Sequence, residues 1–480
     1  MKVIKIIGLG PGDPKHISRK AWEILSSSDE LLLRTNTHPV AQALPSSVRV
    51  ESFDKFYASI TDFDEIYERI VGRVIELADK RDAVVYAVPG DPNVGESTVA
   101  LLRDEARRRG IQVDIIPGIS FIEPSLDLLE IDALDGLYIA DALSLAAGHH
   151  PPFSPDIPVL VAQLYSQNIA ADVKLTLMNQ YADDHPAALL HHVATEQAQV
   201  ENLVLYEIDR SEFIDGMTTL YLPPVETSSS FEAFQETVAH LRAPDGCPWD
   251  REQTHESLRK HILEEAYEVL QAIDNQDLDA LKEELGDLLL QIVLQAQIAG
   301  ETGIFRMSDI LRGINSKIIR RHPHVFEGME VNGIDEVLHN WEALKAVERE
   351  ANGRGEGILD GIPGHLPALA QANEIQSRAA RVGFAWPALK QILNKIEEQY
   401  AEVQEARELD EQSKELGDLF FALVNYAQWL DIDPETALRA TNKRFQVRFS
   451  RMENSIIEQG KNLSEIASNE LEHLWQEQKG

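Results

Sequence analysis

The spacing of hydrophobic positions changes about halfway along the chain. Up to about residue 222, short apolar runs rich in β-branched residues alternate with segments whose apolar residues recur every three or four positions. This alternation is typical of an α/β layer structure, because strands and helices then pack in turn against a shared core. The clearest predicted strands are Val3–Ile7, Ala83–Val88 and Ile111–Ile116, with further extended segments at Val159–Leu164, Leu203–Ile208 and 218–224.

From Phe231 onward the pattern is helical. Long amphipathic segments rich in Glu, Leu, Gln and Ala replace the strand-like alternation. The stretch between the two patterns, PPVETSSS at 223–230, has the proline and serine content of a linker. We therefore predict an α/β domain at 1–222, a linker at 223–230 and an all-helical C-terminal half.

The helical half contains an internal repeat. The segment EELGDLLLQIVLQAQI is echoed by KELGDLFFALVNYAQW, so that LGD falls at 285–287 and again at 416–418. Such self-similarity indicates a duplicated structural unit. We expect two helical repeats, at 231–351 and 352–480, separated near the glycine-rich stretch NGRGEGILDGIPG.

Each repeat carries a set of acidic residues at helical spacing. In the first, Glu265 and Glu268 are three positions apart, as are Glu284 and Asp287. This spacing places each pair on one helix face. The apolar pattern breaks at 274–277, which predicts a turn, and the two pairs are equally far from its middle. An antiparallel helical hairpin would therefore bring all four carboxylates into one patch.

Ionised carboxylates at close range repel one another unless a cation neutralises them. Mg²⁺ suits such a cluster, because it binds carboxylate oxygens and keeps positions open for water and substrate phosphates. Gly286, a mid-helix glycine between the acids, predicts a close backbone approach at that point. A basic cluster in SKIIRRHPHVF offers groups that could bind phosphate: Lys317, Arg320 and Arg321.

Composition and charge exclude several classes of protein. The 480 residues, 44% of them hydrophobic, are enough to build several buried cores. A formal charge of −36 argues against binding to duplex DNA or to an anionic membrane. The single cysteine, Cys247, excludes an internal disulfide and a cysteine-rich zinc site. With no apolar run of about 18 residues and no signal peptide pattern, we expect a soluble cytoplasmic protein.

Three glycine-containing turns follow predicted strands in the first half: GLGPGD at 8–13, PGDPNVGEST at 89–98 and PGIS at 117–120. In a doubly wound sheet such loops gather at the carboxyl edge of the strands, where ligands bind. The first is not a dinucleotide fingerprint, because the third glycine is replaced by Asp13, and no G-K-[ST] marks a P-loop. We expect four glycines to let a ligand approach the backbone: Gly10, Gly12, Gly90 and Gly118.

The helical half resembles the two-repeat MazG-type nucleoside triphosphate pyrophosphohydrolases. The motifs are GCPWDREQTHESL, EEAYEV, EELGDLLLQ, RRHPHVF and LDGIPGHLPAL, and the resemblance covers nearly all of 231–480. It implies Mg²⁺-dependent hydrolysis of a nucleoside triphosphate to a monophosphate and pyrophosphate. It also implies that Glu264 orients or deprotonates the attacking water, and that the Mg²⁺ ligands are Glu265, Glu268, Glu284 and Asp287.

The second repeat keeps most of these positions. Gln399 stands where the first repeat has Glu265, which should weaken metal binding, so we expect the first repeat to hold the stronger site. The remaining acids are Glu398, Glu402, Glu415 and Asp418. Residues that match substrate-handling positions of the family are Lys395, Arg444, Arg448 and Trp475.

Residues 1–222 resemble the tetrapyrrole methylases, through GLGPGDP, GDPNVGEST and PGIS. The resemblance implies two α/β lobes with S-adenosylmethionine bound between them and a methyl acceptor that the sequence does not identify. Phe121 departs from the family, which often has a second serine there. The cofactor-binding residues it implies are Gly10, Pro11, Gly12, Pro89, Gly90, Asp91, Pro117, Gly118, Ile119, Ser120 and Phe121.

The order of the two halves resembles the YabN-type bifunctional proteins. We expect a nucleoside triphosphate pyrophosphohydrolase of the house-cleaning type that carries a methylase-like domain. Two alternatives are a methyltransferase whose helical half is regulatory or dimerising, and a non-enzymatic scaffold that senses nucleotides or metal. The long apolar face of 288–298 also predicts a homodimer.

Overall fold

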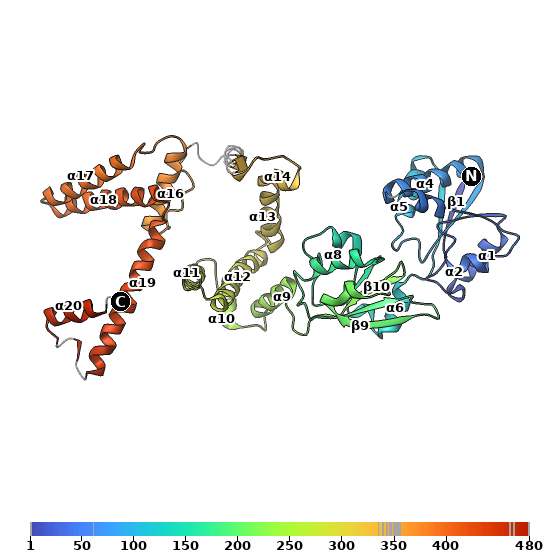
Figure 1. The fold of residues 1–480 in the computed structure, drawn as a ribbon, viewed down its shortest axis with the longest axis horizontal. Helices are drawn as coiled ribbons and strands as arrows, with labels where there is room; N and C mark the ends of the chain where they lie inside the picture. Colours follow the sequence, from blue (N-terminus) through green and yellow to red (C-terminus); the bar gives the residue numbers. More distant parts are fainter. Residues whose placement is uncertain are drawn as a thin grey trace. The chain divides into compact units, whose positions relative to one another are not determined.

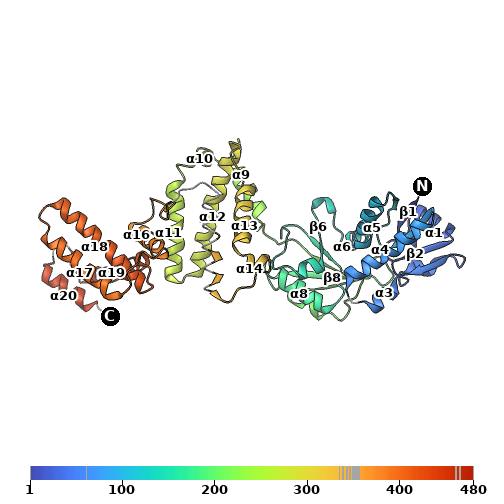
Figure 2. The ribbon, with the colours of Figure 1, turned by 90° about the horizontal axis from the view of Figure 1, so that it is seen from above.

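The computed structural model describes residues 2–60, 62–334, 357–459 and 466–478, together with single positions at 336, 337, 340, 341, 344, 348, 462 and 463 (Figures 1 and 2). The chain forms two compact units, Met1–Pro248 and Trp249–Gly480. The domain boundaries at 222 and 230 stay predictions, and the one between 351 and 352 lies outside the described residues. None of the described helices is both long and apolar enough to span a membrane.

The first lobe of the N-terminal unit is built on a five-stranded parallel sheet with the order β3-β2-β4-β1-β5. Its strands are short and rich in Val, Ile and Leu because helices cover both faces. The strands are β1 (Val3–Gly8), β2 (Glu30–Leu33), β3 (Arg49–Ser52), β4 (Ala83–Val88) and β5 (Gln112–Ile116). The helices are α1 (Arg19–Ser27), α2 (Pro39–Ala43), α3 (Asp54–Ser59), α4 (Phe63–Lys80) and α5 (Ser97–Arg108).

The second lobe is built on a mixed sheet with the order β6-β7-β10-β8-β9, in which only β6 and β7 are parallel. The strands are β6 (Tyr138–Asp141), β7 (Val159–Ala162), β8 (Pro186–His191), β9 (Gln199–Val204) and β10 (Thr218–Leu222). The helices are α6 (Ile122–Leu129), α7 (Ala142–Ala146) and α8 (Gln167–Leu177). Helix α9 (Phe231–Arg242) follows, and Asp156 fixes its start by accepting hydrogen bonds from Ser229 and Ser230.

One predicted strand is wrong. The segment predicted to be extended over 203–208 belongs to β9 only as far as Val204, and a 3₁₀ helix spans Leu205–Arg210. Leu205 and Ile208 are three residues apart and both fully buried, which suits a helix with three residues per turn. The backbone N–H of Leu205 donates to the carbonyl oxygen of His185, which lies just before β8, so the start of the 3₁₀ helix is attached to the end of the β8–β9 pair.

The C-terminal unit is entirely helical in its described part. Its first repeat contains α11 (Arg259–Asn275), α12 (Leu278–Glu301), α13 (Met307–Arg321) and α14 (Pro323–Phe326), preceded by the short α10 (Pro248–Arg251). The second contains α16 (Ala368–Arg381), α17 (Leu389–Glu405), α18 (Leu409–Trp429), α19 (Pro434–Glu458) and α20 (Ser468–Glu477). Helices α11 and α12 form one antiparallel hairpin, and α17 and α18 form its counterpart (Figure 2). The predicted α/β and duplicated all-helical halves are confirmed.

The turn of the first hairpin lies where the sequence predicts it. Helix α11 ends at Asn275, Gln276 adopts the left-handed conformation at φ 56°, and Asp277 accepts a hydrogen bond from the N–H of Ala280 to cap α12. A left-handed residue followed by an aspartate cap reverses the chain within two residues. This tight reversal sets the height at which side chains of α11 face those of α12.

Candidate functional site

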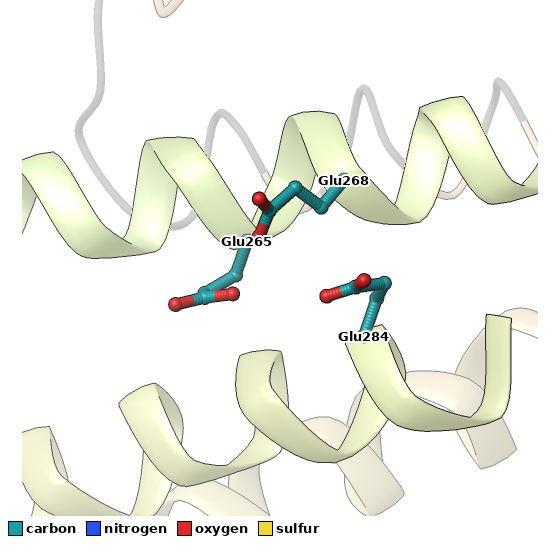
Figure 3. A group of neighbouring side chains, drawn as sticks. All are labelled: Glu265, Glu268 and Glu284. Atoms are coloured by element: carbon teal, nitrogen blue, oxygen red, sulfur yellow. The ribbon is translucent and has the colours of Figure 1, made fainter. Parts of the chain in front are cut away.

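The hairpin of the first repeat brings acidic side chains from both helices together. Glu265 and Glu268 come from α11 and Glu284 comes from α12, and one carboxylate oxygen of each lies within 4.8 Å of the others. Figure 3 shows Glu265 and Glu284 extending into the space between the two helices and Glu268 running along α11 toward Glu265. Three residues that the sequence predicts as metal ligands are therefore adjacent, as the antiparallel hairpin requires.

The carboxylates repel one another. Partial burial raises the pKa of Glu265, and its contact with Glu268 and the charge of Asp287 raise it further. Desolvation also raises the pKa of Glu284, followed by the charges of Glu268 and Glu283. Asp287, the fourth predicted ligand, acts on both groups through its charge. The cluster holds more negative charge than its protein surroundings neutralise, and this is the condition under which a divalent cation binds.

Two other features were predicted for this site, a water-activating glutamate and a close backbone approach at a glycine. Glu264, the predicted water-activating residue, is exposed beside the cluster and lies 3.5 Å from Nδ1 of His261. The close backbone approach predicted at Gly286 is wrong for the described residues, because a Cβ built there would meet no atom within 4 Å. The same is true of Gly417 in the second repeat. Packing among the described residues explains neither glycine.

The predicted phosphate-binding arginines have a protein partner. Arg320 and Arg321, at the end of α13, both donate to the carboxylate of Glu348, with Arg320 Nη2 at 2.6 Å from Oε1. The two guanidinium groups lower the pKa of Glu348 to about 2. Lys317 lies half-buried on the same helix. Their role in binding phosphate stays a prediction, and an incoming phosphate would meet arginines that already hold a carboxylate.

The second repeat arranges its acids on the equivalent hairpin but neutralises several of them internally. Lys395 Nζ lies 2.8 Å from Glu398, and Lys414 Nζ lies 2.8 Å from Glu415. The hydrogen bond from Lys414 lowers the pKa of Glu415. These two ion pairs make the second cluster less negative than the first.

The remaining acids of the second cluster also meet a neutral side chain. Gln399, which replaces one predicted ligand carboxylate, donates a hydrogen bond to Glu402. Desolvation and the charges of Glu415 and Glu398 nevertheless raise the pKa of Glu402. Asp418 lies close enough for its charge to raise the pKa of Lys395, after the larger effect of Glu398. The hairpin of the second repeat therefore carries less uncompensated negative charge than the hairpin of the first repeat.

The other predicted residues of the second repeat line a separate cavity of about 1290 Å³. The guanidinium group of Arg448 lies 3.8 Å above the ring of Trp475, and its Nε donates to the carbonyl oxygen of that residue. Arg444 lines the same cavity, together with Tyr267 and Asp274 of α11. Lys395 and the acids of α17 and α18 do not line it, so the structure divides the predicted second-repeat site into two groups.

In the N-terminal unit, the loops after β1 and β4 bind each other directly. Gly10 and Gly90 form a backbone bridge, with N···O distances of 3.2 and 2.8 Å. Strands β4 and β1 are neighbours in the sheet. The chain after β1 connects to β2, toward one edge of the sheet, and the chain after β4 connects to β5, toward the other edge. Ligands bind at such a point in open α/β sheets.

Asp91 and Gly118 join the third loop to the other two. Oδ2 of Asp91 accepts from the N–H of Gly118, and Oδ1 accepts from Asn93. A Cβ on Gly118 would lie 2.4 Å from the carbonyl oxygen of Gly90, so only glycine fits. The chain's own backbone occupies the space at Gly118, whereas we expected a ligand there. Gly90 is required for another reason, because its φ of 64° is unfavourable for other residues.

A cavity of about 420 Å³ lies where these loops face the second lobe. Six of the eleven predicted cofactor-binding residues line it: Pro11, Pro89, Gly90, Asp91, Ser120 and Phe121. Ile119 instead lines a neighbouring cavity. Gly10, Gly12, Pro117 and Gly118 line neither cavity, and Gly10 and Gly118 instead join the loops through backbone hydrogen bonds.

Sequence reasoning missed much of the cavity wall. Thr35, Thr37 and His38 follow β2, and Glu96 ends the loop after β4. The second lobe adds Ala162, Gln163, Val193, Gly216, Met217, Thr218 and Thr219. Several of these residues could have been found from their positions at strand ends. Thr35 lies two residues after β2, Ala162 ends β7 and Thr218 begins β10.

Two protein-family models match this chain, one in each half. The model of the tetrapyrrole (corrin/porphyrin) methylases matches residues 3–209. The model of the MazG nucleotide pyrophosphohydrolase domain matches residues 253–326, which include the acidic cluster of the first repeat.

Individual proteins are similar over long stretches. The chain is 37% identical to the YabN protein of Bacillus subtilis (strain 168), over 99% of this chain and 98% of YabN. It is 42% identical to the nucleoside triphosphate pyrophosphohydrolase/pyrophosphatase MazG of Thermotoga maritima, over 53% of this chain and 98% of that protein. It is 43% identical to the nucleoside triphosphate pyrophosphohydrolase of Escherichia coli (strain K12), over 50% of this chain and 93% of that protein.

The repulsion within the first cluster can be tested by removing one charge. Because the pKa of Glu284 is raised in the folded chain, its ionised form costs stability at neutral pH, and the cost disappears as the pH falls through the raised pKa. In the presence of a chelator, we expect Glu284→Gln to raise the midpoint of thermal unfolding. Added Mg²⁺ should stabilise the wild type but not this variant.

The matched control is Asp279→Asn, which removes an exposed charge from the same helix outside the cluster. It should leave the response to Mg²⁺ unchanged. A lower midpoint for Glu284→Gln in chelator would contradict the repulsion, and equal Mg²⁺ responses in all three proteins would contradict a metal site.

Proposed function

Because this chain belongs to the family of proteins that fuse a tetrapyrrole methylase domain to a MazG nucleotide pyrophosphohydrolase domain, we propose that its helical half hydrolyses nucleoside triphosphates. The products are a nucleoside monophosphate and pyrophosphate, and the reaction depends on Mg²⁺. The observation that carries this proposal is the cluster of Glu265, Glu268 and Glu284, whose negative charge the surrounding protein leaves uncompensated.

The donor set suits the ion. Carboxylate oxygens are the preferred ligands of Mg²⁺, and Glu265, Glu268 and Glu284 would hold it. We keep Asp287 as the fourth ligand, because its charge acts on both Glu265 and Glu284. When bound, Mg²⁺ promotes ionisation of water and neutralises charge on phosphate oxygens. We assign to Glu264, which is exposed and next to Glu265 in α11, the role of accepting a proton from the attacking water.

The charge balance favours the first repeat as the active one. In the second repeat, Lys395 and Lys414 each pair with an acid, and Gln399 supplies an amide where the first repeat has a carboxylate. A cluster that is already partly neutralised attracts a divalent cation less strongly. The 253–326 segment that matches the MazG domain model also lies in the first repeat.

Pyrophosphate release from a panel of nucleoside triphosphates tests this function. We expect release with Mg²⁺ and none with chelator. Glu265→Ala and Glu268→Ala should each reduce turnover at least about a hundredfold, since loss of a metal ligand should exceed the 10–100-fold cost of disturbing an outer-shell partner. The matched variant in the other repeat, Glu398→Ala, should retain most of the activity.

Two results would change these conclusions. Loss of turnover with Glu398→Ala alone would place the active site in the second repeat. Absence of pyrophosphate release by the wild type would leave methyl transfer or a non-enzymatic sensing role as the function of the chain.

For the N-terminal half, we propose that the cavity between the lobes binds S-adenosylmethionine. The support is geometric: the loops after β1, β4 and β5 converge there, and Gly90, Asp91 and Ser120 line the cavity. Backbone groups of glycine-containing loops can approach a ligand more closely than side chains can.

Calorimetric titration with S-adenosylmethionine tests this site. We expect measurable binding by the wild type and an affinity lowered several-fold or more in Gly90→Ala, because a Cβ at positive φ costs about 1–2 kcal/mol and would disturb the bridge to Gly10. Gly72→Ala is the control, since Gly72 lies within α4 and a Cβ there meets nothing within 4 Å. Absence of heat with the wild type would contradict cofactor binding.

We also propose that the helical half forms a homodimer. Most of the apolar face predicted at 288–298 packs inside the chain, as Val293 and Leu294 do at 3% exposure. Helices α12 and α13 nevertheless expose large apolar side chains, including Leu285, Ile292, Ile314 and Ile318, which are 43–49% accessible. Large apolar side chains exposed at several positions of two consecutive helices favour a surface that a partner covers. A second copy of the chain is the simplest partner that every molecule in solution would meet.

Light scattering at micromolar concentration tests the dimer. We expect twice the chain mass of 53.8 kDa for the wild type and the monomer mass for the double variant Ile314→Lys/Ile318→Lys. Leu175→Lys, which changes an exposed leucine of α8 in the other unit, should remain dimeric. A monomeric wild type would refute the proposal.

A further inference from the structure

His38 is a buried histidine at the point where the chain passes from β2 to α2. It directly precedes Pro39, and a residue before a proline favours the extended backbone that His38 adopts, with φ −66° and ψ 132°. The residue is only 8% exposed and lines the cavity between the N-terminal lobes. A buried polar ring in a cavity wall needs partners, and the contacts of its two nitrogens show what it does there.

Both ring nitrogens of His38 are engaged by the backbone. Nδ1 accepts from the N–H of Val40 at 3.3 Å, which is the first N–H that α2 offers because Pro39 has none. Nε2 lies 3.0 Å from the carbonyl oxygen of Gly10. Since an N–H group can only donate, Nδ1 carries no proton, and the proton on Nε2 is donated to Gly10.

This arrangement requires a neutral ring. A second proton would sit on Nδ1 and face the N–H of Val40, so the charged form would lose that contact. Burial lowers the pKa of His38 more than the hydrogen bond to Gly10 raises it, which agrees with a neutral side chain at pH 7. His38 therefore has no ring nitrogen left to offer a ligand in the cavity.

The carbonyl oxygen of Gly10 accepts two hydrogen bonds. One comes from the N–H of Gly90 at 2.8 Å, as part of the backbone bridge, and the other comes from His38. These bonds fill both acceptor positions of the oxygen. Gly10 has a φ of 83°, and a glycine backbone moves freely unless contacts hold it. His38 thus ties the loop after β2 to the bridge between the loops after β1 and β4.

The position of this carbonyl group affects the cavity wall on two sides. Pro11 follows Gly10 in the chain and lines the cavity, and so does Gly90, its partner in the bridge. A rotation of the Gly10 carbonyl group would therefore displace both parts of the wall. A site that is held in its binding geometry before the ligand arrives binds more tightly, because less freedom is lost on binding.

We propose that His38 is a positioning residue of the N-terminal cavity. Its neutral ring holds the Gly10 carbonyl group, and through it the bridge to Gly90, in the arrangement that binds S-adenosylmethionine. This inference rests on the proposed cofactor site. His38 acts through the loops, since both of its nitrogens are used by the chain itself.

Two substitutions separate the two contacts of the ring. Asparagine places an oxygen where histidine has Nδ1, so His38→Asn keeps the acceptor for Val40 but is too short to reach Gly10. Glutamine places an amide nitrogen where histidine has Nε2, so His38→Gln keeps the donor for Gly10. Asparagine is a preferred residue at the start of a helix, so a role confined to capping α2 would make the asparagine variant the better of the two.

Calorimetric titration of the full chain with S-adenosylmethionine measures the effect. We expect His38→Gln to bind about as tightly as the wild type. The affinity of His38→Asn should be lowered about three- to tenfold, which is the effect of one hydrogen bond of ordinary strength. Thermal unfolding should show both variants folded at the assay temperature. The control is His149→Asn, which changes an exposed histidine of the second lobe and should bind like the wild type.

Several results would overturn the proposal. Full affinity in His38→Asn, or a loss confined to His38→Gln, would show that the bond to Gly10 does not matter for binding. Equal losses in both variants would assign the effect to the ring itself, and unfolding of His38→Asn at the assay temperature would assign it to stability. Absence of heat with the wild type would refute the cofactor site as well, whereas the other results leave that site standing.

Discussion

Mutual repulsion among carboxylates is the constraint on which the helical half depends. The hairpin of α11 and α12 holds Glu265, Glu268 and Glu284 within 4.8 Å, although each would be more stable apart from the others. The tight reversal at Gln276 and Asp277 leaves these groups little freedom to separate, because it sets the register of the two helices. A fold that concentrates like charge in this way gains stability when a cation binds, so the frame and its ligand are energetically coupled.

The two repeats carry different charges on equivalent helical hairpins. Both hairpins bring acids of successive helices together, and the second pairs two of its acids with Lys395 and Lys414. Gln399 replaces a carboxylate at the centre of that cluster. These changes relieve the repulsion without a metal ion. The difference in charge between the repeats therefore lies in a few side chains on equivalent helical hairpins.

In the N-terminal half, three loops lie close together at one edge of the sheet. Backbone pairing of Gly10 with Gly90 and the hydrogen bond from Gly118 to Asp91 join the loops without long side chains. The missing side chain at Gly118 lets two backbones meet. Polar side chains such as Thr35, Gln163 and Thr218 then remain for the cavity wall. The loops are held in place by their contacts with one another, and the residues around them supply most of the polar groups of the cavity.

Much of this could be predicted from local patterns in the sequence. The period of the apolar residues separated the α/β half from the helical half, the repeated LGD revealed the duplication, and symmetry about the turn at 274–277 predicted the acidic cluster. These features depend on residues close in sequence or on the geometry of a single hairpin. Helical spacing is enough to determine which side chains share a face.

Only the tertiary structure decided what each face meets. It paired Arg320 and Arg321 with Glu348, added Thr218 of the second lobe to a cavity predicted from the first, and left the space beside Gly286 empty. Each outcome depends on segments brought together from distant parts of the chain, and the spacing of residues within one element carries no information about its neighbour in space. The local sequence therefore determines which chemical groups the chain can offer, while long-range packing determines the partners of each charged group.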